Sequence, residues 1–327
     1  MSSGEILRGG AGEGHRRPNH FAGGAIDRVV DRRRDADWIT ARAADPTSVV
    51  VPVWRSRSLV VPDRDGRFGY DAVLLSIRQA TEVAGPQSEW ILLGVERDRA
   101  VFAAEVTDAP VVRTPGDPVD PPPLPGELHD LHRIGATLDQ HEGSLLAYAR
   151  AVVTWSRAHR FCGRCGHPTR PEEGGHVRRC DNAVCAAQHF PRTDPAIIVL
   201  VEDRDRCLLG RKDSWPTGVY SALAGFVEPG ESLSEAVARE VREETGIEVD
   251  HVRYRSSQPW PFPASLMLGF HARRTGGELA IDVHELSDAR WVDRDELARR
   301  HESDAGLPSR VSIARRLIAE WLSGDGE

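Results

Sequence analysis

The chain has 327 residues and a formal net charge of −8, which is enough length for two or three domains that each bury a core. The acidic balance argues against a general nucleic-acid or membrane binder, although it leaves room for RNA as a substrate presented end-on. The longest apolar runs are strand-sized and no apolar segment precedes a cleavage site, so we expect a cytoplasmic protein without a transmembrane helix.

The first third of the chain is expected to hold a tail and a β-rich domain. Residues 1–25 are rich in Gly, Arg and His and poor in apolar residues, which predicts a disordered tail. Residues 26–125 alternate short β-branched or aromatic runs with turn residues, which predicts an N-terminal α+β domain. Its composition indicates no chemistry. The expected strands cover residues 48–54, 58–61, 72–77, 90–95 and 101–106.

A linker and a helix follow this domain. Residues 115–125 contain six prolines and are predicted to form a stiff, extended linker that ends the N-terminal domain. Residues 126–160 are predicted to connect it to the rest of the chain. Within them, apolar residues recur at helical spacing over residues 144–158, which predicts an amphipathic helix.

Four cysteines mark the next segment, residues 161–190. Cys162 and Cys165 form one close pair, and Cys180 and Cys185 form a second. Two such pairs separated by a hairpin-sized segment are typical of a ribbon around a tetrahedral Zn²⁺. Four thiolate ligands leave the ion no open position for a substrate, so the zinc is expected to be structural. The alternative, a redox pair at Cys162 and Cys165, leaves the second pair without a role. Cys207 lies in an apolar run and is predicted to be buried.

Residues 191–327 are predicted to form an α/β domain with a sheet between helices. The expected strands cover residues 196–201, 206–210, 266–272 and 289–292, and residues 219–225 lead into a turn. Ser232 followed by Glu235 is a capping-box pattern that predicts the start of a helix, and Gly246 predicts its end. A last helix is expected over residues 312–322, with Ser312 as its N-cap.

Glu240, Glu243 and Glu244 share one arc near the C-terminal end of the first of these helices. Like charges at this spacing repel by roughly 0.2–0.5 kcal/mol per pair, and the helix macrodipole also disfavours anions at this end. A bound Mg²⁺ or Mn²⁺ would remove both penalties. The alternative is a solvated acidic face on which Arg239 pairs with Glu235 and Glu243, and the carboxylates alone do not separate the two interpretations.

The whole stretch over residues 225–247 resembles the signature of the Nudix hydrolases. The matching positions are Gly225, Glu231, Arg239, Glu240, Val241, Glu243, Glu244, Gly246 and Ile247. The resemblance implies an α-β-α sandwich Nudix fold for the C-terminal domain, in an α+β protein that also carries a zinc ribbon and an N-terminal α+β domain. It also implies a metal-dependent hydrolase.

Residues 257–265 narrow the resemblance. Three prolines stiffen this stretch, and Trp260 and Phe262 offer flat faces for stacking on a base. Taken alone, it is equally a proline-aromatic surface loop. Downstream of the Nudix signature it resembles the NADH pyrophosphatase branch, whose order of motifs also includes the cysteine ribbon and segments like residues 190–195 and 312–315. This branch implies a homodimer that hydrolyses NAD(H) to NMN(H) and AMP and removes the NAD cap from RNA 5′ ends.

The resemblance assigns roles position by position. It implies divalent-metal ligands at the carbonyl of Ala224 and at Glu240, Glu244 and Glu285, and structural Zn²⁺ at Cys162, Cys165, Cys180 and Cys185. The catalytic set is Glu231, Arg239, Glu240, Glu243 and Glu244, and either Glu243 or Glu285 is the proton acceptor. The expected substrate contacts are Phe190, Phe226, Gln258, Pro259, Trp260, Pro261, Phe262, Pro263, Ala264, Ser265, Glu285 and Ala314.

Departures from the family pattern leave the metal chemistry intact. Phe190 stands where Tyr is common, and Gly175 and His176 stand where an aromatic residue is frequent, so substrate preference is expected to shift. Two alternatives stay open. One is a Nudix hydrolase of ADP-ribose or another nucleoside diphosphate derivative, and the other is a zinc-ribbon protein that senses nucleotides or binds nucleic acid.

Overall fold

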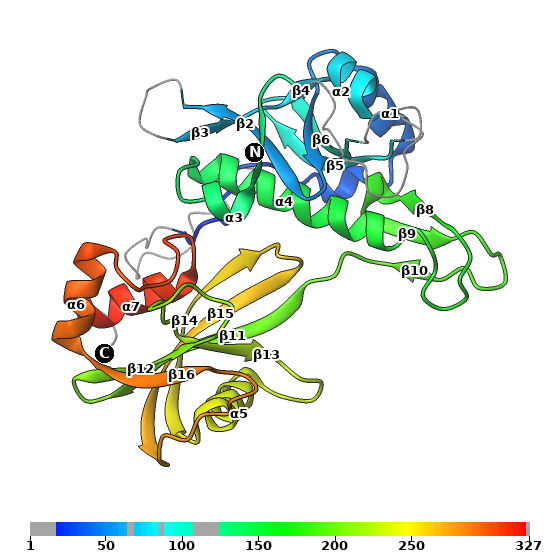
Figure 1. The fold of residues 1–327 in the computed structure, drawn as a ribbon. Helices are drawn as coiled ribbons and strands as arrows, with labels where there is room; N and C mark the ends of the chain where they lie inside the picture. The colour runs from blue at the N-terminus through cyan, green and yellow to red at the C-terminus, as the bar shows by residue number, and fades with distance from the viewer. Residues whose placement is uncertain (1–17, 64–68, 85–87, 107–123, 325–327) are drawn as a thin grey trace, which may run out of the picture.

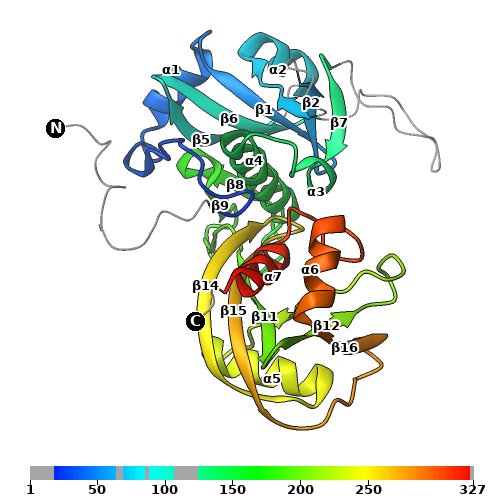
Figure 2. The same ribbon diagram turned by 90° about the vertical axis from the view of Figure 1, so that its left-hand side faces the viewer.

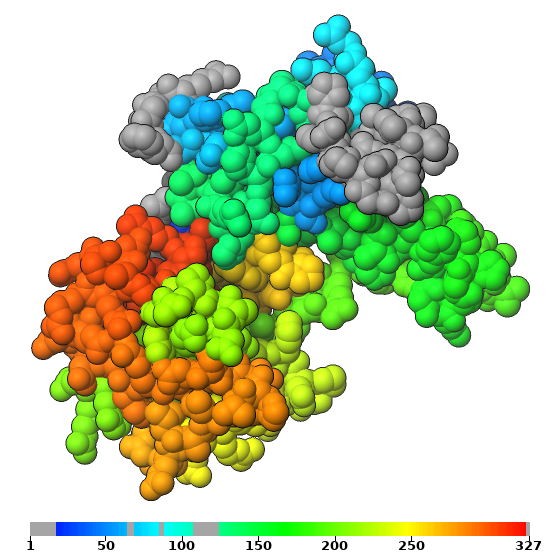
Figure 3. Space-filling model, in the orientation of Figure 1, coloured from blue at the N-terminus to red at the C-terminus, as the bar shows by residue number. Residues whose placement is uncertain are grey.

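A computed structural model describes residues 18–63, 69–84, 88–106 and 124–324. They form an N-terminal lobe, a small β-ribbon attached to it, and a C-terminal lobe (Figure 1). The space-filling view in Figure 3 shows the β-ribbon projecting sideways from the N-terminal lobe. Within the described residues, no helix has both the length and the apolar character needed to cross a membrane.

The N-terminal lobe is built on a seven-stranded sheet with the order β3-β2-β1-β6-β5, in which β4 pairs with β1 and β7 pairs with β2. The strands are β1 (Val49–Trp54), β2 (Arg57–Pro62), β3 (Tyr70–Ala72), β4 (Leu75–Ser76), β5 (Trp90–Glu96), β6 (Arg99–Glu105) and β7 (Glu127–Asp130). The helices are η1 (Val30–Arg32), α1 (Ala36–Ala44), α2 (Ile77–Ala84), α3 (Leu131–Ile134) and α4 (Gln140–Ala158).

Helices cover both faces of this sheet. Side chains of α4 such as Leu146 pack with Val51 on one face, and α1 and α2 pack over the opposite face. The strand expected over residues 72–77 is instead the end of β3, the short β4 and the start of α2. Ile77, Ala80 and Ala84 recur at helical spacing, and they make this segment a helix that packs on the sheet.

The tail predicted for residues 1–25 needs a correction at its end. Residues 1–17 lie outside the described part of the chain, as does most of the predicted proline-rich linker. Phe21, in contrast, is only 3% exposed and packs against Trp260 and Phe262 of the C-terminal lobe. A lone aromatic residue in a polar stretch is buried here because tertiary packing supplies an apolar surface for it.

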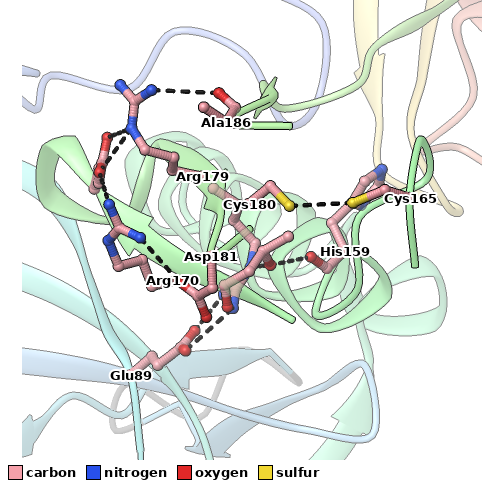
Figure 4. A network of polar contacts seen from close by, with 11 residues as sticks. Glu89, His159, Cys165, Arg170, Arg179, Cys180, Asp181 and Ala186 are labelled. Carbon is pink, nitrogen blue, oxygen red and sulfur yellow. Dashed lines mark hydrogen bonds and ion pairs between the residues drawn. The ribbon is translucent and has the colours of Figure 1, made fainter. Parts of the chain in front are cut away.

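The β-ribbon consists of β8 (Thr169–Glu172), η2 (Glu173–Gly175), β9 (Val177–Cys180) and β10 (Gln188–His189), with the strand order β10-β9-β8. Arg178, 1% exposed, joins it to the N-terminal lobe through an ion pair with Glu89 and a hydrogen bond of 2.8 Å to Ser156 Oγ. His176 Nε2 lies 2.7 Å from the carbonyl oxygen of Leu92 on β5. Figure 4 shows Glu89 below the ribbon residues.

The C-terminal lobe has a six-stranded sheet with the order β14-β15-β11-β12-β16, and β13 also pairs with β11. The strands are β11 (Asp194–Asp203), β12 (Arg206–Arg211), β13 (Leu223–Phe226), β14 (Glu248–Trp260), β15 (Ser265–Gly276) and β16 (Asp288–Asp293). The helices are α5 (Leu233–Thr245), α6 (Arg294–Ser303) and α7 (Ile313–Ser323).

Alternate residues of β11 face different helices. Ile197 and Val199 pack with α5, whereas Ile198 and Leu200 pack with α6 and α7. Figure 2 shows α5 on one side of the sheet and α7 on the other. The predicted α-β-α sandwich is therefore confirmed, and Cys207 is buried in it as expected.

Candidate active site

The local structure of α5 follows the sequence prediction. The Ser232 hydroxyl accepts from the Glu235 N–H, and the Glu235 carboxylate accepts from the Ser232 N–H at 2.8 Å. Gly246 ends the helix with φ 71°, a left-handed conformation that favours glycine. These caps fix where α5 begins and ends, and therefore which side chains it turns toward β13.

Gly225 brings α5 close to β13. A Cβ atom at this position would collide with the carboxylate of Glu240, so any other residue would push the helix and strand apart. The glycine lets the Glu240 carboxylate lie against the strand that carries Ala224, whose carbonyl is a predicted metal ligand. Glu240 is 15% exposed, and its Oε1 lies 2.9 Å from Arg239 Nη1.

Arg239 ties the signature turn to the helix. It donates to Glu231 from Nε at 2.5 Å and from Nη2 at 2.9 Å, and Nη2 also donates to the Phe226 carbonyl at 2.9 Å. The Arg239 side chain lowers the pKa of Glu231. Arg239 Nη1 donates to Glu243 at 2.9 Å, while Glu235 is occupied by the cap. Arg239 thus orients the carboxylates of Glu231 and Glu243.

Glu244 is the most deeply placed of the signature carboxylates. It is 2% exposed, and its Oε2 has no hydrogen-bond partner among the described residues. Its pKa is raised to about 7, mainly by burial and also by the charges of Glu240 and Glu285, against the opposing charge of Lys212. A buried carboxylate oxygen without a partner is costly unless a proton or a cation satisfies it. Carboxylate oxygens are hard ligands that Mg²⁺ and Mn²⁺ favour, so either cation would satisfy this oxygen.

Glu244 opens into a cavity of about 260 Å³, which we call the acidic cavity. Ala224, Glu244, Gln258 and Trp260 line it, together with Lys212, Trp215 and other residues. Lys212 and Trp215 lie in a loop after β12 that matches no motif quoted above, so no sequence pattern indicates them. Lys212 Nζ lies 3.7 Å from Glu285 Oε2, so this lysine adds a positive charge beside the carboxylates.

The residues predicted to contact substrate on the hairpin of β14 and β15 divide into groups. Gln258 and Trp260 line the acidic cavity. Pro259, Pro261, Ala264 and Ser265, again with Trp260, line a different cavity on the N-terminal side. Phe262 packs against the N-terminal lobe, and Pro263 is exposed at the tip.

Gln258 is fully buried, and backbone groups engage its amide. Nε2 donates to the carbonyls of His20 and Val311 at 3.1 and 2.7 Å, and Oε1 accepts from the Ile313 N–H at 2.8 Å. The side chain therefore joins the hairpin to the N-terminus of α7. These hydrogen bonds satisfy the buried amide of Gln258 without a contribution from a substrate.

The remaining predicted contacts lie at the surface or in the core. Phe190 and Phe226 are 61% and 60% exposed, which leaves their rings open for stacking. Glu285 is 58% exposed. Ala314 is fully buried in the first turn of α7, and its N–H donates to the Ser312 cap at 3.2 Å. Ala314 therefore offers no exposed side chain to a substrate.

Among the described residues, the four cysteines are the one group of three or more His, Cys, Asp or Glu side chains whose ligand atoms all lie within 4.8 Å of one another. The structure does not bring the predicted ligands Glu240, Glu244 and Glu285 that close together. Figure 4 shows Cys165 and Cys180 facing each other, with Sγ atoms 3.4 Å apart. Burial opposes ionisation of Cys162, but hydrogen bonds from the Arg164 N–H and from His189 lower its pKa to about 6. Four converging sulfurs fit Zn²⁺.

Three family models match consecutive parts of the chain. An NADH pyrophosphatase-like rudimentary NUDIX domain matches residues 47–155, an NADH pyrophosphatase zinc ribbon domain matches residues 157–190, and a NUDIX domain matches residues 191–311. The first match shows that the N-terminal lobe, whose composition indicated no chemistry, is itself Nudix-like.

Curated relatives are similar over most of the chain. The NAD-capped RNA hydrolase NudC of Mycobacterium bovis is 41% identical over 308 residues, which cover 90% of this chain and 92% of the relative. The human NAD-capped RNA hydrolase NUDT12 is 32% identical over 93% of this chain and 73% of the relative. NudC of Stutzerimonas stutzeri is 49% identical over 55% of this chain and 62% of the relative. The chain therefore belongs to the Nudix hydrolase family, in the group with an NADH pyrophosphatase zinc ribbon and a rudimentary N-terminal Nudix domain.

Proposed function

We propose that this protein hydrolyses the diphosphate of NAD(H) to NMN(H) and AMP, and that it removes the NAD cap from RNA 5′ ends. The observation that carries the proposal is the buried Glu244 with its unpartnered oxygen at the wall of the acidic cavity. The zinc-ribbon match and the names of the relatives support the choice of substrate.

In the proposed mechanism, Glu240, Glu244, Glu285 and the Ala224 carbonyl would hold the divalent ions. When bound, Mg²⁺ or Mn²⁺ supplies positive charge to the diphosphate and makes water more nucleophilic. Arg239 keeps the carboxylates of the turn and helix in place through its bonds to Glu231 and Glu243.

A carboxylate takes the proton of the attacking water. Glu243, 55% exposed, and Glu285, 58% exposed, both remain candidates. Each also pairs with a cation, Arg239 and Lys212 respectively. Comparison of Glu243→Gln with Glu285→Gln in single-turnover rates over a range of pH would assign the role.

Other expectations extend this proposal. The hairpin over Gln258 to Ser265 and the exposed Phe190 and Phe226 are proposed to contact substrate, and the four cysteines are proposed to hold one Zn²⁺. The segment boundaries, a homodimer and a cytoplasmic location also stay predictions. Sedimentation velocity at micromolar concentration tests the dimer.

Product analysis tests the function. Wild type and Glu244→Gln are incubated with NADH, ADP-ribose and a short NAD-capped RNA, each with Mg²⁺ or Mn²⁺. We expect NMNH and AMP from NADH and a decapped RNA with wild type, and at least about a 100-fold lower kcat with the variant. Cleavage of ADP-ribose with NADH left intact would contradict the proposed substrate.

A further inference from the structure

A second cavity, of about 380 Å³, lies where the N-terminal lobe, the β-ribbon and the hairpin of β14 and β15 meet. We call it the arginine cavity. Its walls include Arg28, Arg33, Tyr148, His176, Arg192 and Trp260. No carboxylate of the described residues lines it. Arg192 pairs with Asp194, which lies outside the lining, so Arg28 and Arg33 are the arginines of the wall that matter for an anion.

Arg28 and Arg33 are held by the same phenol ring. The guanidinium carbon of Arg28 lies 4.2 Å from the centroid of Tyr148, and Arg28 forms no ion pair within the described part of the chain. Arg33 Nη2 donates to the Tyr148 hydroxyl at 3.3 Å, while its buried Nε has no hydrogen-bond partner among the described residues. Guanidinium groups in this state retain N–H donors for an anion.

His176 reflects the charge of this region. Its pKa is lowered to about 4, mainly by burial and also by the positive charges of Arg33 and Arg28, against the hydrogen bond to Leu92. The same two arginines lower the pKa of Tyr148, against a larger effect of burial that raises it. The positive charges of Arg28 and Arg33 therefore act on both His176 and Tyr148 in the cavity wall.

We propose that the arginine cavity is a second binding site, which takes the phosphate group of a mononucleotide. Arginine presents a planar fork of donors that matches phosphate oxygens, and Arg28 and Arg33 have such donors to spare. The volume lies in the range of small-molecule pockets. The indole of Trp260 provides a flat apolar face for a base.

Trp260 also separates the two cavities, since it lines the acidic cavity as well. A ligand in the arginine cavity would therefore touch the wall of the acidic cavity without occupying it. The proposal extends the proposed function, because hairpin residues proposed to contact substrate, among them Pro259, Ala264 and Ser265, also line this cavity. It concerns binding alone, since none of the signature carboxylates lines the arginine cavity.

Calorimetric titration of the zinc-loaded full chain tests the site. AMP and, separately, inorganic phosphate are titrated without added Mg²⁺ or Mn²⁺ into wild type, Arg28→Gln and the double variant Arg28→Gln with Arg33→Gln. Arg32→Gln is the matched control, because Arg32 is a neighbouring exposed arginine that does not line the cavity. Lys212→Met tests binding in the acidic cavity.

We expect AMP to bind wild type, Arg32→Gln and Lys212→Met alike. The double variant should bind at least about 10-fold more weakly, and the exposed Arg28→Gln should give part of this loss with an unchanged melting temperature. AMP should bind more tightly than phosphate. Absence of AMP binding, equal binding by the double variant, or loss in Lys212→Met alone would overturn the proposal, and equal affinity for AMP and phosphate would overturn its mononucleotide part.

Discussion

At the scale of single residues, the buried Glu244 links protonation to metal binding. Its pKa of about 7 means that a divalent cation must displace a proton below this pH and displaces none above it. We expect the affinity for Mn²⁺ to fall about tenfold per pH unit below pH 7 and to be constant above it. Titration calorimetry from pH 5.5 to 8.5 measures this, and an affinity that does not change with pH would contradict it.

The same carboxyl affects stability in the metal-free protein. Its pKa rises from an ordinary carboxyl value of 4.5 to about 7 on folding, so between these values the folded chain holds a proton that the unfolded chain has lost. The contribution of the protonated Glu244 carboxyl to the free energy of unfolding is complete below pH 4.5 and is lost as pH rises to about 7. Glu244→Gln should lack this component of the pH dependence in urea unfolding.

Gln258 is a predicted substrate contact whose buried amide instead bonds to the backbone of neighbouring segments. Because its amide is fully buried and bonded to backbone groups, Gln258→Leu leaves buried donors and acceptors unpaired, and we expect a loss of about 1–3 kcal/mol in the free energy of unfolding. The exposed Gln188→Leu is the control and should change it by less than about 0.5 kcal/mol. Unchanged stability with a raised KM for NADH would instead favour direct substrate contact.

At the scale of elements, α4 of the N-terminal lobe holds the tip of the hairpin in the C-terminal lobe. Arg150 Nε donates to the Pro261 carbonyl at 2.7 Å, and its guanidinium carbon lies 4.8 Å from the centroid of Phe262. We expect Arg150→Met to raise the KM for NADH by about 3- to 10-fold with a change in kcat of less than about twofold, because the hairpin is displaced while the metal site is kept.

Arg157→Met is the matched control for this prediction. Arg157 lies on the same helix and pairs with Glu105, away from the hairpin. Steady-state kinetics on both variants check the expectation. A fall in kcat with an unchanged KM for Arg150→Met would show that α4 acts on the carboxylates and not on the hairpin.

At the scale of the whole molecule, the β-ribbon depends on its four cysteines and is joined to the N-terminal lobe by the buried Arg178. A small three-stranded sheet has little core of its own, so loss of zinc should unfold it and expose the Arg178 contact. We expect a strong chelator to release one zinc per chain and to lower the melting temperature by more than about 5 °C. Added Zn²⁺, but not Mg²⁺, should restore it, and a chelated protein with an unchanged melting temperature would contradict the prediction.

The sequence by itself determined the features that are encoded within short distances along the chain. The capping box at Ser232, the end of α5 at Gly246 and the strands β11 and β12 follow from neighbouring residues. The cysteine set follows from spacing alone. The arc of carboxylates on α5 follows from helical periodicity. Each of these depends on local backbone geometry, which a sequence pattern specifies directly.

Only the tertiary structure decided which distant residues meet. It buried Phe21 against Trp260, placed Lys212 beside Glu285, and divided the hairpin between two cavities. It also brought Arg28 and Arg33, which precede the N-terminal sheet in sequence, to the same cavity as Tyr148 of α4 and His176 of the β-ribbon. These contacts join segments far apart in sequence, and burial and charge complementarity select them only once the lobes have packed, so no local pattern records them.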